Sequence, residues 1–389
     1  MREALILLAV SGLTLAQPAP HGFIGAGGCA SSNCHGATTG APVTESRILG
    51  NEYAIWSVSD KHARAFKALE EARGKRMAEI LGIADATRDK RCTVCHAVGT
   101  TDKSRSDGVA CEACHGPAEN WLGPHTKPNS HEASVKAGMT DTKKLDIRAK
   151  TCLACHLGAS GQDVDHELIA AGHPDLAFEL DTFTAAQPAH HRPPAQNMRQ
   201  RAWAVGQTVG LAEAMRLVLA HEKSWPEFSD LECYQCHHDL RAESWRIQRG
   251  YDGRKPGTLQ LNMGRVEMVR ALVAAAAPDE RAAFEAAAGR LNASSPAASA
   301  KAMEHIADTL TERFQKQDID ASAVLKSVTA NIHRIANEGV SAAEQATMTL
   351  DALGTNPDAT APLYNYLEHP SMYRASEFAA KFQKAAANQ

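Results

Sequence analysis

The sequence predicts a mostly α-helical protein in which a part rich in cysteine and histidine precedes an alanine-rich part. Two observations lead to this fold class. No stretch of the 389 residues alternates apolar and polar side chains as a half-exposed strand would. Beyond Tyr251, alanine-rich charged stretches place apolar residues at helical spacing. We therefore expect helices throughout, joined by long loops.

The expected helices follow in chain order. Two long ones, Glu52–Ile80 and Met198–His221, fall in the cysteine-rich part. The turn-rich segment "GYDGRKPGTLQLN" then forms a connector. After it, prolines at suitable boundaries separate four more expected helices: Arg265–Ala276, Asp279–Leu291, Ala300–Lys316 and Ser341–Leu353. The sequence thus divides into residues 17–250, a cysteine-rich domain, and residues 251–389, an alanine-rich helical domain.

All 10 cysteines belong to five short motifs, each closed by a histidine. The first motif is stretched by two residues, and the other four read C-x-x-C-H. In chain order the motifs are Cys29/Cys34/His35, Cys92/Cys95/His96, Cys111/Cys114/His115, Cys152/Cys155/His156 and Cys233/Cys236/His237.

C-x-x-C-H is the signature of covalent c-type haem attachment. Each thiol forms a thioether to a vinyl group, and the histidine is the proximal ligand to iron. The spacing of the second and third motifs would also suit a zinc ribbon. Tetrahedral zinc on four thiolates, however, has no use for a histidine after each pair. The sequence predicts five covalently bound c-type haems, no disulfide, and no haem in the alanine-rich domain.

Candidates for the second axial ligand come from the remaining histidines. His62 is expected on one helical face with Ile55, Phe66 and Leu69, where that face could lie on a porphyrin. His166 precedes an apolar stretch, and His173 precedes Pro174, where a helix should stop.

Two further candidates are His125, in "LGPHTKP", and His238, which follows a proximal histidine and could serve a neighbouring haem. The dipeptide His237-His238 resembles that of the small tetrahaem cytochromes of sulfate reducers. His131, His190, His191 and His221 are weaker candidates, and "PAHHRPP" is expected to be a solvent-exposed loop.

The N-terminus and the net charge bear on location and partners. Residues 1–16 combine one arginine with a short apolar run, as a secretory signal peptide does. The run is too short for a membrane span, so we expect a periplasmic or otherwise exported protein without a stable span after cleavage. A net charge of −4 and no basic field argue against a nucleic-acid partner.

Several segments together resemble the cytochrome c-554 type, a tetrahaem acceptor of electrons from hydroxylamine oxidoreductase, and its pentahaem relatives. These segments are "WSVSDKH", "GVACEACHGP", "HELIAAGHPDLAFEL" and "CYQCHHDL". The resemblance covers about 28–240 and leaves out the alanine-rich domain. It implies a helical wrap around stacked and perpendicular haem pairs, with irons held mainly by two histidines. One haem of the namesake is five-coordinate and open.

Two functions remain open at this stage. The first is a periplasmic electron carrier between other redox proteins, whose C-terminal helices dock a partner or form a homo-oligomer. The second is an enzyme that reduces or oxidises a small nitrogen compound, such as nitrite, nitric oxide or hydroxylamine, at one open haem. An open haem would need a proton donor beside it, and Arg192, Tyr234 and His191 are candidates.

Overall fold

The computed structural model describes residues 22–40, 48–99, 101–191, 196–224, 226–237, 259–291 and 296–389. The expected signal peptide, His238, Arg192 and the boundary at 250/251 lie outside these ranges. Within them the chain forms helices and two isolated bridges, Ala159 with Gln162 and Leu231 with Leu261, without a longer strand. The expectation of a mostly α protein is confirmed.

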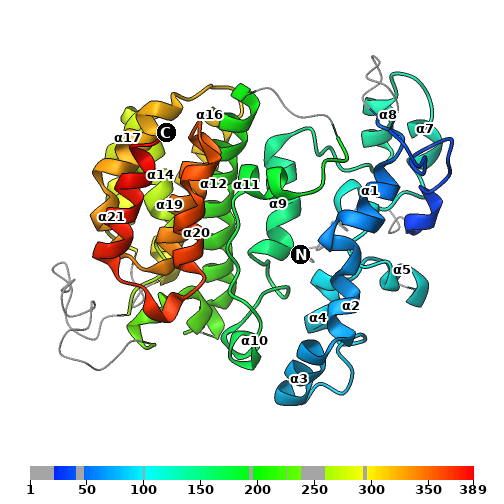
Figure 1. Cartoon of the computed structure of the whole chain (residues 1–389), viewed down its shortest axis with the longest axis horizontal. Helices are drawn as coiled ribbons and strands as arrows, with labels where there is room; N and C mark the ends of the chain where they lie inside the picture. The colour runs from blue at the N-terminus through cyan, green and yellow to red at the C-terminus, as the bar shows by residue number, and fades with distance from the viewer. Residues whose placement is uncertain are drawn as a thin grey trace, which may run out of the picture.

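The described N-terminal part, residues 22–191, consists of short helices, with α1 to α5 at the right of Figure 1. Each motif histidine or its candidate partner lies at or near the end of one of these elements. They are η1 (Ala26–Gly28), α1 (Glu52–Ser59), η2 (Lys61–Arg64), α2 (Ala65–Glu70), α3 (Ala72–Leu81), α4 (Lys90–His96), α5 (Asp102–Ser106), α6 (Cys111–His115), α7 (Leu122–His125), α8 (His131–Lys136), α9 (Leu145–His156), α10 (His166–Ala171) and α11 (Leu180–Ala186).

The expected single helix Glu52–Ile80 is wrong, because the chain breaks twice within it. Asp60 is extended, and its carboxylate accepts a hydrogen bond from the backbone N–H of His62, which starts the 3-10 turn η2. Glu71 is also extended and separates α2 from α3. His62 therefore lies on a turn between helices and not on the expected continuous helical face. An aspartate competes locally for backbone N–H groups, and here that competition ends the helix.

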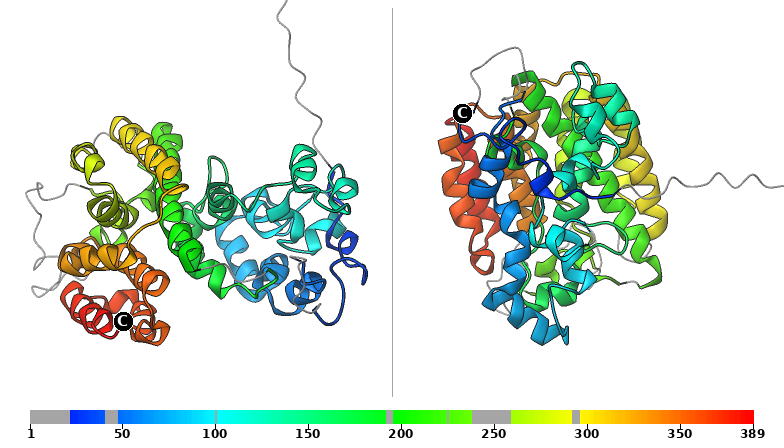
Figure 2. Two further views of the ribbon diagram at one scale, coloured as in Figure 1. Left: turned by 90° about the horizontal axis from the view of Figure 1, so that it is seen from above. Right: turned by 90° about the vertical axis from the view of Figure 1, so that its right-hand side faces the viewer.

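The second part is a bundle of longer helices, at the left of both Figure 1 and the left view of Figure 2. Of the expected helices, Met198–His221 corresponds to α12, and the four C-terminal ones correspond to α14, α15, α16 and α19. The bundle consists of α12 (Gln196–Ala220), α14 (Gly264–Ala276), α15 (Arg281–Ala288), α16 (Pro296–Phe314), α17 (Ala321–Ala330), α18 (Ile332–Asn337), α19 (Val340–Leu353), α20 (Ala361–Leu367) and α21 (Ala375–Ala386).

Helix α12 lies between the two parts, as the left view of Figure 2 shows. It packs on α16 and α14 of the bundle and on α9 and α11 of the N-terminal part. Trp203 on α12 is fully buried, and its indole N–H donates to the hydroxyl of Thr349 on α19 at 3.1 Å. A helix buried on nearly all sides needs such partners for its few polar groups.

The two parts differ in how much apolar side chain they bury. One large core joins α9, α11, α12 and the bundle helices, whereas the separate core among α2, α3 and their neighbours has only Leu69, Ala78 and Ala86 as buried members. A core with only three buried side chains cannot by itself offset the conformational entropy that the surrounding short helices lose on folding. Across the described ranges, no helix is both long and apolar enough to span a bilayer.

Candidate functional site

The five motifs sit on short helical elements that present their cysteines and histidine on one turn. The second, third and fourth motifs end α4, α6 and α9 respectively, and the fifth begins with the turn η5 (Cys233–Gln235). The first motif follows η1. None of the 10 cysteines is paired in a disulfide. Helix α9 is the most firmly held, because its Ala149 and Leu153 are buried in the large core.

The cysteines of the first and fifth motifs are less enclosed than the rest. Cys34, Cys233 and Cys236 are exposed, whereas the other seven cysteines are partly buried. The sequence assigned all 10 cysteines to haem attachment, and the structure does not enclose Cys34, Cys233 or Cys236. The assignment of all 10 cysteines to haem attachment stays a prediction from the motif pattern.

Local structure explains why Cys34 and Cys236 are exposed. Cys34 closes a tight turn within the stretched motif, where its backbone N–H donates to the carbonyl oxygen of Ser31 at 2.9 Å. Cys236 follows the single turn η5, and the neighbouring His237 is exposed as well. The first motif has no residue in the large core, and the fifth contributes only Tyr234, which is partly buried against it. Their cysteines are consequently covered by few side chains of the chain itself.

Four of the five motif histidines lie opposite a second histidine. The centroids of the two rings are 5.8 Å apart for His35 and His125, 6.3 Å for His96 and His173, 6.0 Å for His156 and His62, and 6.1 Å for His237 and His166. Each pair joins segments far apart in the sequence. His62, His125, His166 and His173 are the stronger candidates named from the sequence whose positions are described, and each meets a different motif.

The ring nitrogens in these pairs are oriented by hydrogen bonds to Nδ1. Nδ1 of His35 lies 3.0 Å from Oε2 of Glu52, and Nδ1 of His62 lies 3.0 Å from Oδ1 of Asp60. Nδ1 of His96 lies 2.8 Å from the carbonyl oxygen of Ala65. The same contact at 2.8 Å joins His173 to the carbonyl of Pro174.

The electrostatics of the pairs follow from these contacts and from burial. The hydrogen bond with Glu52 raises the pKa of His35 above its usual value. Burial, followed by the proximity of His62, lowers the pKa of His156 to about 4. Burial also lowers the pKa of His125 and of His173. The last three rings are therefore held neutral, the form in which imidazole binds a metal.

His115 of the third motif differs from the other motif histidines. Among the ring contacts in the described parts of the chain, none involves His115. Burial, and next the neighbouring His190, lower the pKa of His115 to about 4. His190 and His191 follow α11, and their rings contact one another at 5.3 Å. The expectation of a solvent loop is wrong for these two residues, since both are half-buried.

Two of the weaker candidates for an axial ligand, His131 and His221, use ring nitrogens to contact aspartate carboxylates. Nε2 of His131 lies 3.1 Å from Oδ1 of Asp141. His221 contacts Asp230 through Nδ1 at 2.8 Å and Asp163 through Nε2 at 3.2 Å. The hydrogen bond with Asp230 raises the pKa of His221 to about 9. Both ring nitrogens of His221 are engaged, so it serves as an ionic link between loops.

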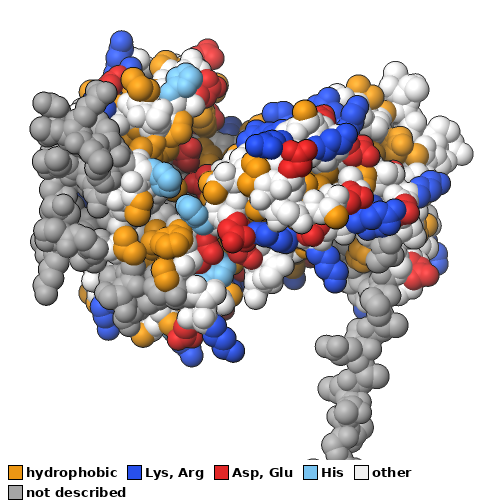
Figure 3. Space-filling model, turned by 90° about the horizontal axis from the view of Figure 1, so that it is seen from below, with side chains coloured by type: hydrophobic (Ala, Val, Ile, Leu, Met, Phe, Trp, Pro, Cys, Tyr) orange, Lys and Arg blue, Asp and Glu red, His pale blue; other side chains and the backbone are white. Residues whose placement is uncertain are grey.

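The motifs also approach one another. The thiol of Cys29 is within hydrogen-bonding reach of Cys111, and that of Cys95 within reach of Cys155. Cys114 lies close enough to Cys152 for their charges to interact. Figure 3 shows histidine side chains on the left-hand half of one face, beside acidic and apolar ones. The first four motifs therefore form one continuous cluster.

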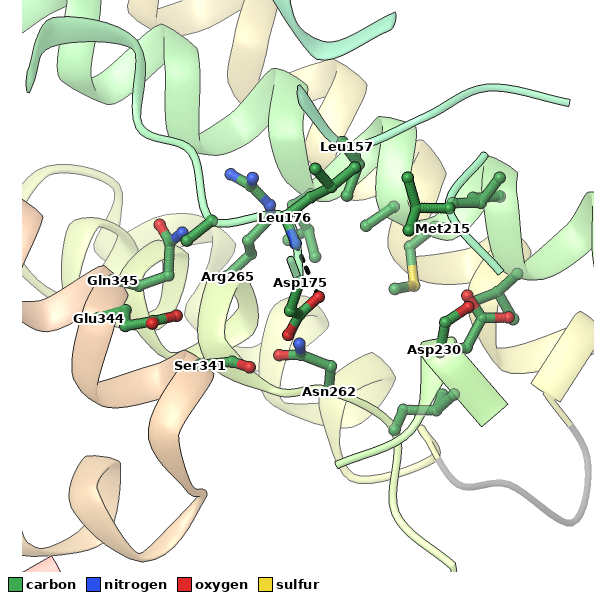
Figure 4. A pocket seen from close by; sticks show the side chains of 18 residues that line it. Leu157, Asp175, Leu176, Met215, Asp230, Asn262, Arg265, Ser341, Glu344 and Gln345 are labelled. Carbon is green, nitrogen blue, oxygen red and sulfur yellow. Dashed lines mark hydrogen bonds between the residues drawn. The ribbon is translucent and has the colours of Figure 1, made fainter. Parts of the chain in front are cut away.

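A cavity of about 100 Å³ lies between the 175–177 segment and the bundle helices α12, α14 and α19 (Figure 4). Asp175, Arg265 and Glu344 are among the residues that line it. Burial, and next Asp175, raise the pKa of Glu344 to about 7. Both carboxylates also act on the thiol of Cys233, so the cavity adjoins the fifth motif.

Some residues that orient the rings were not predicted. Glu52 and Asp60 hold Nδ1 of His35 and His62, yet nothing in the motif pattern indicates them. A local signal exists for Asp60, because an aspartate two residues before a histidine can cap a turn. No comparable signal exists for Glu52, which lies 17 positions from His35.

Comparisons with known proteins agree with the motif pattern. Residues 29–116 match the family described as cytochrome c554 and c-prime. Cytochrome c-554 of Nitrosomonas europaea is 31% identical over 178 residues, which cover 41% of this chain and 66% of that protein, slightly less than two thirds. The search of solved structures gave no match. Over residues 29–116 this chain is therefore similar to the cytochrome c554 family.

Proposed function

We propose that this chain is an exported pentahaem c-type cytochrome that carries electrons between other redox proteins. One observation carries the proposal: four motif histidines each face a second histidine at nearly the same ring distance, 5.8 to 6.3 Å. A metal–imidazole bond of about 2 Å on each side, with ring bonds of about 1.3 Å, places two centroids about 6 Å apart. The four pairs match the spacing of two imidazoles on one iron.

The hydrogen bonds at Nδ1 support the same ligand assignment. A ligating histidine usually gives its other ring N–H to a carboxylate or a carbonyl, which fixes its tautomer and orientation. His35, His62, His96 and His173 have such a partner at Nδ1, which leaves Nε2 available. The ten cysteines would form the thioethers, and a bound haem would supply one-electron chemistry at its iron.

The exposed positions of Cys34 and Cys236 are compatible with this assignment. A thioether joins the vinyl group at the edge of the porphyrin, and an edge can face solvent while the ring is enclosed. We therefore include both cysteines among the ten, on the strength of their motifs. In this proposal the first and fifth haems have a more accessible edge than the others, which suits exchange of electrons with a partner.

The role of the chain's own residues is to hold and insulate these groups. Carboxylates at Nδ1 of His35 and His62 make the rings stronger electron donors, which favours oxidised iron and lowers the reduction potential. At the first, second, fourth and fifth motifs, the two facing histidines would together hold a bound haem iron and would leave it no open position. Such capped centres suit electron transfer better than substrate binding.

A second candidate function rests on the third motif. His115 has no ring contact with another histidine among the described residues, while His190 and His191 lie nearby. An iron held there by His115 alone would be open, with a histidine beside it as proton donor. The protein would then reduce or oxidise a small nitrogen compound such as nitrite or hydroxylamine.

Electron paramagnetic resonance of the oxidised protein separates the two functions, and intact mass gives the haem number. We expect five haems per chain and only low-spin signals. A high-spin signal that responds to nitrite, nitric oxide or hydroxylamine would favour the enzyme, and the variant His115→Ala should then abolish the response. A mass that corresponds to fewer than five haems would contradict the pentahaem assignment.

A further inference from the structure

Helix α10 (His166–Ala171) is short, and the histidines at its two ends lie opposite the histidines of two different motifs. It begins at His166, whose ring lies 6.1 Å from that of His237 in the fifth motif. The chain leaves the helix at Gly172, which has the positive φ of 115° that favours glycine, and continues into His173. The ring of His173 lies 6.3 Å from that of His96 in the second motif.

The short length of α10 fixes the spacing of these two histidines. They are seven positions apart, and a helical rise of 1.5 Å per residue gives a separation of about 10 Å along the axis. The side chain of Asp165 caps the helix by accepting the N–H of Leu168 at 2.8 Å. Capped at its start and ended by Gly172, α10 has little freedom to change its length.

Contacts from the second motif hold α10 in place on one side. Arg91, which directly precedes Cys92, forms an ion pair with Asp165 at 2.6 Å and approaches Glu167 at 3.5 Å. Arg73 on α3 donates through Nε to the carbonyl oxygen of Gly172 at 3.1 Å. The start of α10 is thereby tied to α4, which carries the second motif, and its end is tied to α3.

Contacts from the fifth motif hold the start of the same helix. The backbone N–H of His166 donates to Oε1 of Glu227 at 3.0 Å, and the ring of Phe228 lies 5.6 Å from the ring of His166. This segment runs on to Cys233. The carboxylates of Asp175, Glu232 and Glu344 lie near the thiol of Cys233.

We propose that α10 is a two-ended ligand helix, which supplies one axial ligand to the haem of the second motif and one to that of the fifth. This inference rests on the proposed function. The first four motifs meet through their thiols, whereas the fifth joins them through α10. The fifth haem site is accordingly a terminal one, and its nearest neighbour is the second site.

Paired ligand removals test this neighbour relation by magnetic resonance. His166→Ala and His173→Ala should each convert one iron to the high-spin form. In the double variant the two high-spin irons are neighbours, and their magnetic coupling should broaden both signals, so that intensity is lost. The matched pair His166→Ala with His125→Ala opens the fifth and first sites, and its spectrum should equal the sum of the single variants.

Additive spectra in both pairs, or equal broadening in both, would overturn the proposal. Intact mass keeps this test apart from the proposed function, because a chain with fewer than five haems contradicts that function whatever the coupling. If a histidine variant fails to fold, Arg91→Gln retains every ligand but removes the ion pair with Asp165.

Arg91→Gln should shift the low-spin signals of two sites together, the second and the fifth, and leave the others unchanged. The control Arg76→Gln removes an exposed arginine that pairs only with Glu79 in the described structure, and should shift none. A shift confined to one signal, or no shift in Arg91→Gln, would also overturn the proposal.

Discussion

At the scale of single residues, the hydrogen-bond partner of each imidazole separates the histidines into two groups. His62 and His173 use Nδ1 for a carboxylate or carbonyl and keep Nε2 available. His131 instead uses Nε2 for Asp141, and His221 uses both nitrogens for aspartates. A metal ligand needs one nitrogen with a free lone pair, so His221 is suited to an ionic link, whereas His131 keeps only Nδ1 for a ligand.

The ionic link at His221 should stabilise the fold in a pH-dependent way. Its pKa is raised from 6.5 to about 9 in the folded chain. The stabilisation is therefore fully present below pH 6.5 and is lost as the pH rises through about 9. We expect His221→Gln to lower the free energy of unfolding by roughly 1.5–3 kcal/mol on the acidic side, as for a hydrogen bond to a charged group.

Chemical denaturation followed by circular dichroism, once below pH 6.5 and once above pH 9, measures this difference. His305→Gln is the matched control, because His305 is exposed on α16 and should give little change at either pH. An equal loss for His221→Gln at both pH values would mean that packing, and not charge, accounts for its contribution.

At the scale of helices, close contact between α11 and α12 positions the segment that leads to His190. Gly206 on α12 faces Leu180 on α11, and an added Cβ would lie 2.6 Å from the Cβ of Leu180. Leu180 is buried and cannot move its Cβ without moving the backbone of α11. The glycine at this position permits the two helices to approach.

We expect Gly206→Ala to lower the free energy of unfolding by about 1–3 kcal/mol, the usual cost of overpacking a core. The sign is diagnostic, because alanine in a helix interior is otherwise more favourable than glycine by about 1 kcal/mol. Urea denaturation gives the measurement. In the control Gly123→Ala the added Cβ meets no atom of the chain within 4 Å, and a gain in stability for Gly206→Ala would contradict the packing argument.

At the scale of the whole molecule, the two parts should depend differently on the haem groups. The bundle and α9, α11 and α12 share a large core of side chains, whereas the separate core of the N-terminal part has three buried members. Porphyrin rings would supply the missing apolar interior there. The motifs are thus part of the folding requirement as well as of the function.

A chain made without haem attachment should lose order in α1 to α8 and keep the bundle. We expect limited proteolysis of such a chain to cut within residues 48–136 and to leave a protected fragment that contains α12 and α14 to α21. Mass spectrometry of the fragments checks this, with the haem-loaded protein as control. Equal protection of α1 to α8 in both forms would show that side chains alone hold that part.

How much of the fold can be predicted from the sequence depends on how far apart in the chain the interacting residues lie. Expected helices such as Met198–His221 and Ser341–Leu353 correspond to α12 and α19 because helical periodicity is a local property. Helices α17, α18, α20 and α21 were not predicted. The break at Asp60 was also missed, because propensity alone could not decide between a continued helix and a capped turn.

The sequence by itself determined the five motifs and four of the histidines that lie opposite them, because motif spacing and residue type are local. Only the tertiary structure decided which histidine faces which motif, and that Cys34 and Cys236 are exposed while most other motif cysteines are partly buried. His62 meets His156, and His125 meets His35. These contacts join segments separated by tens of residues, and long-range packing, which no local pattern encodes, sets their pairing.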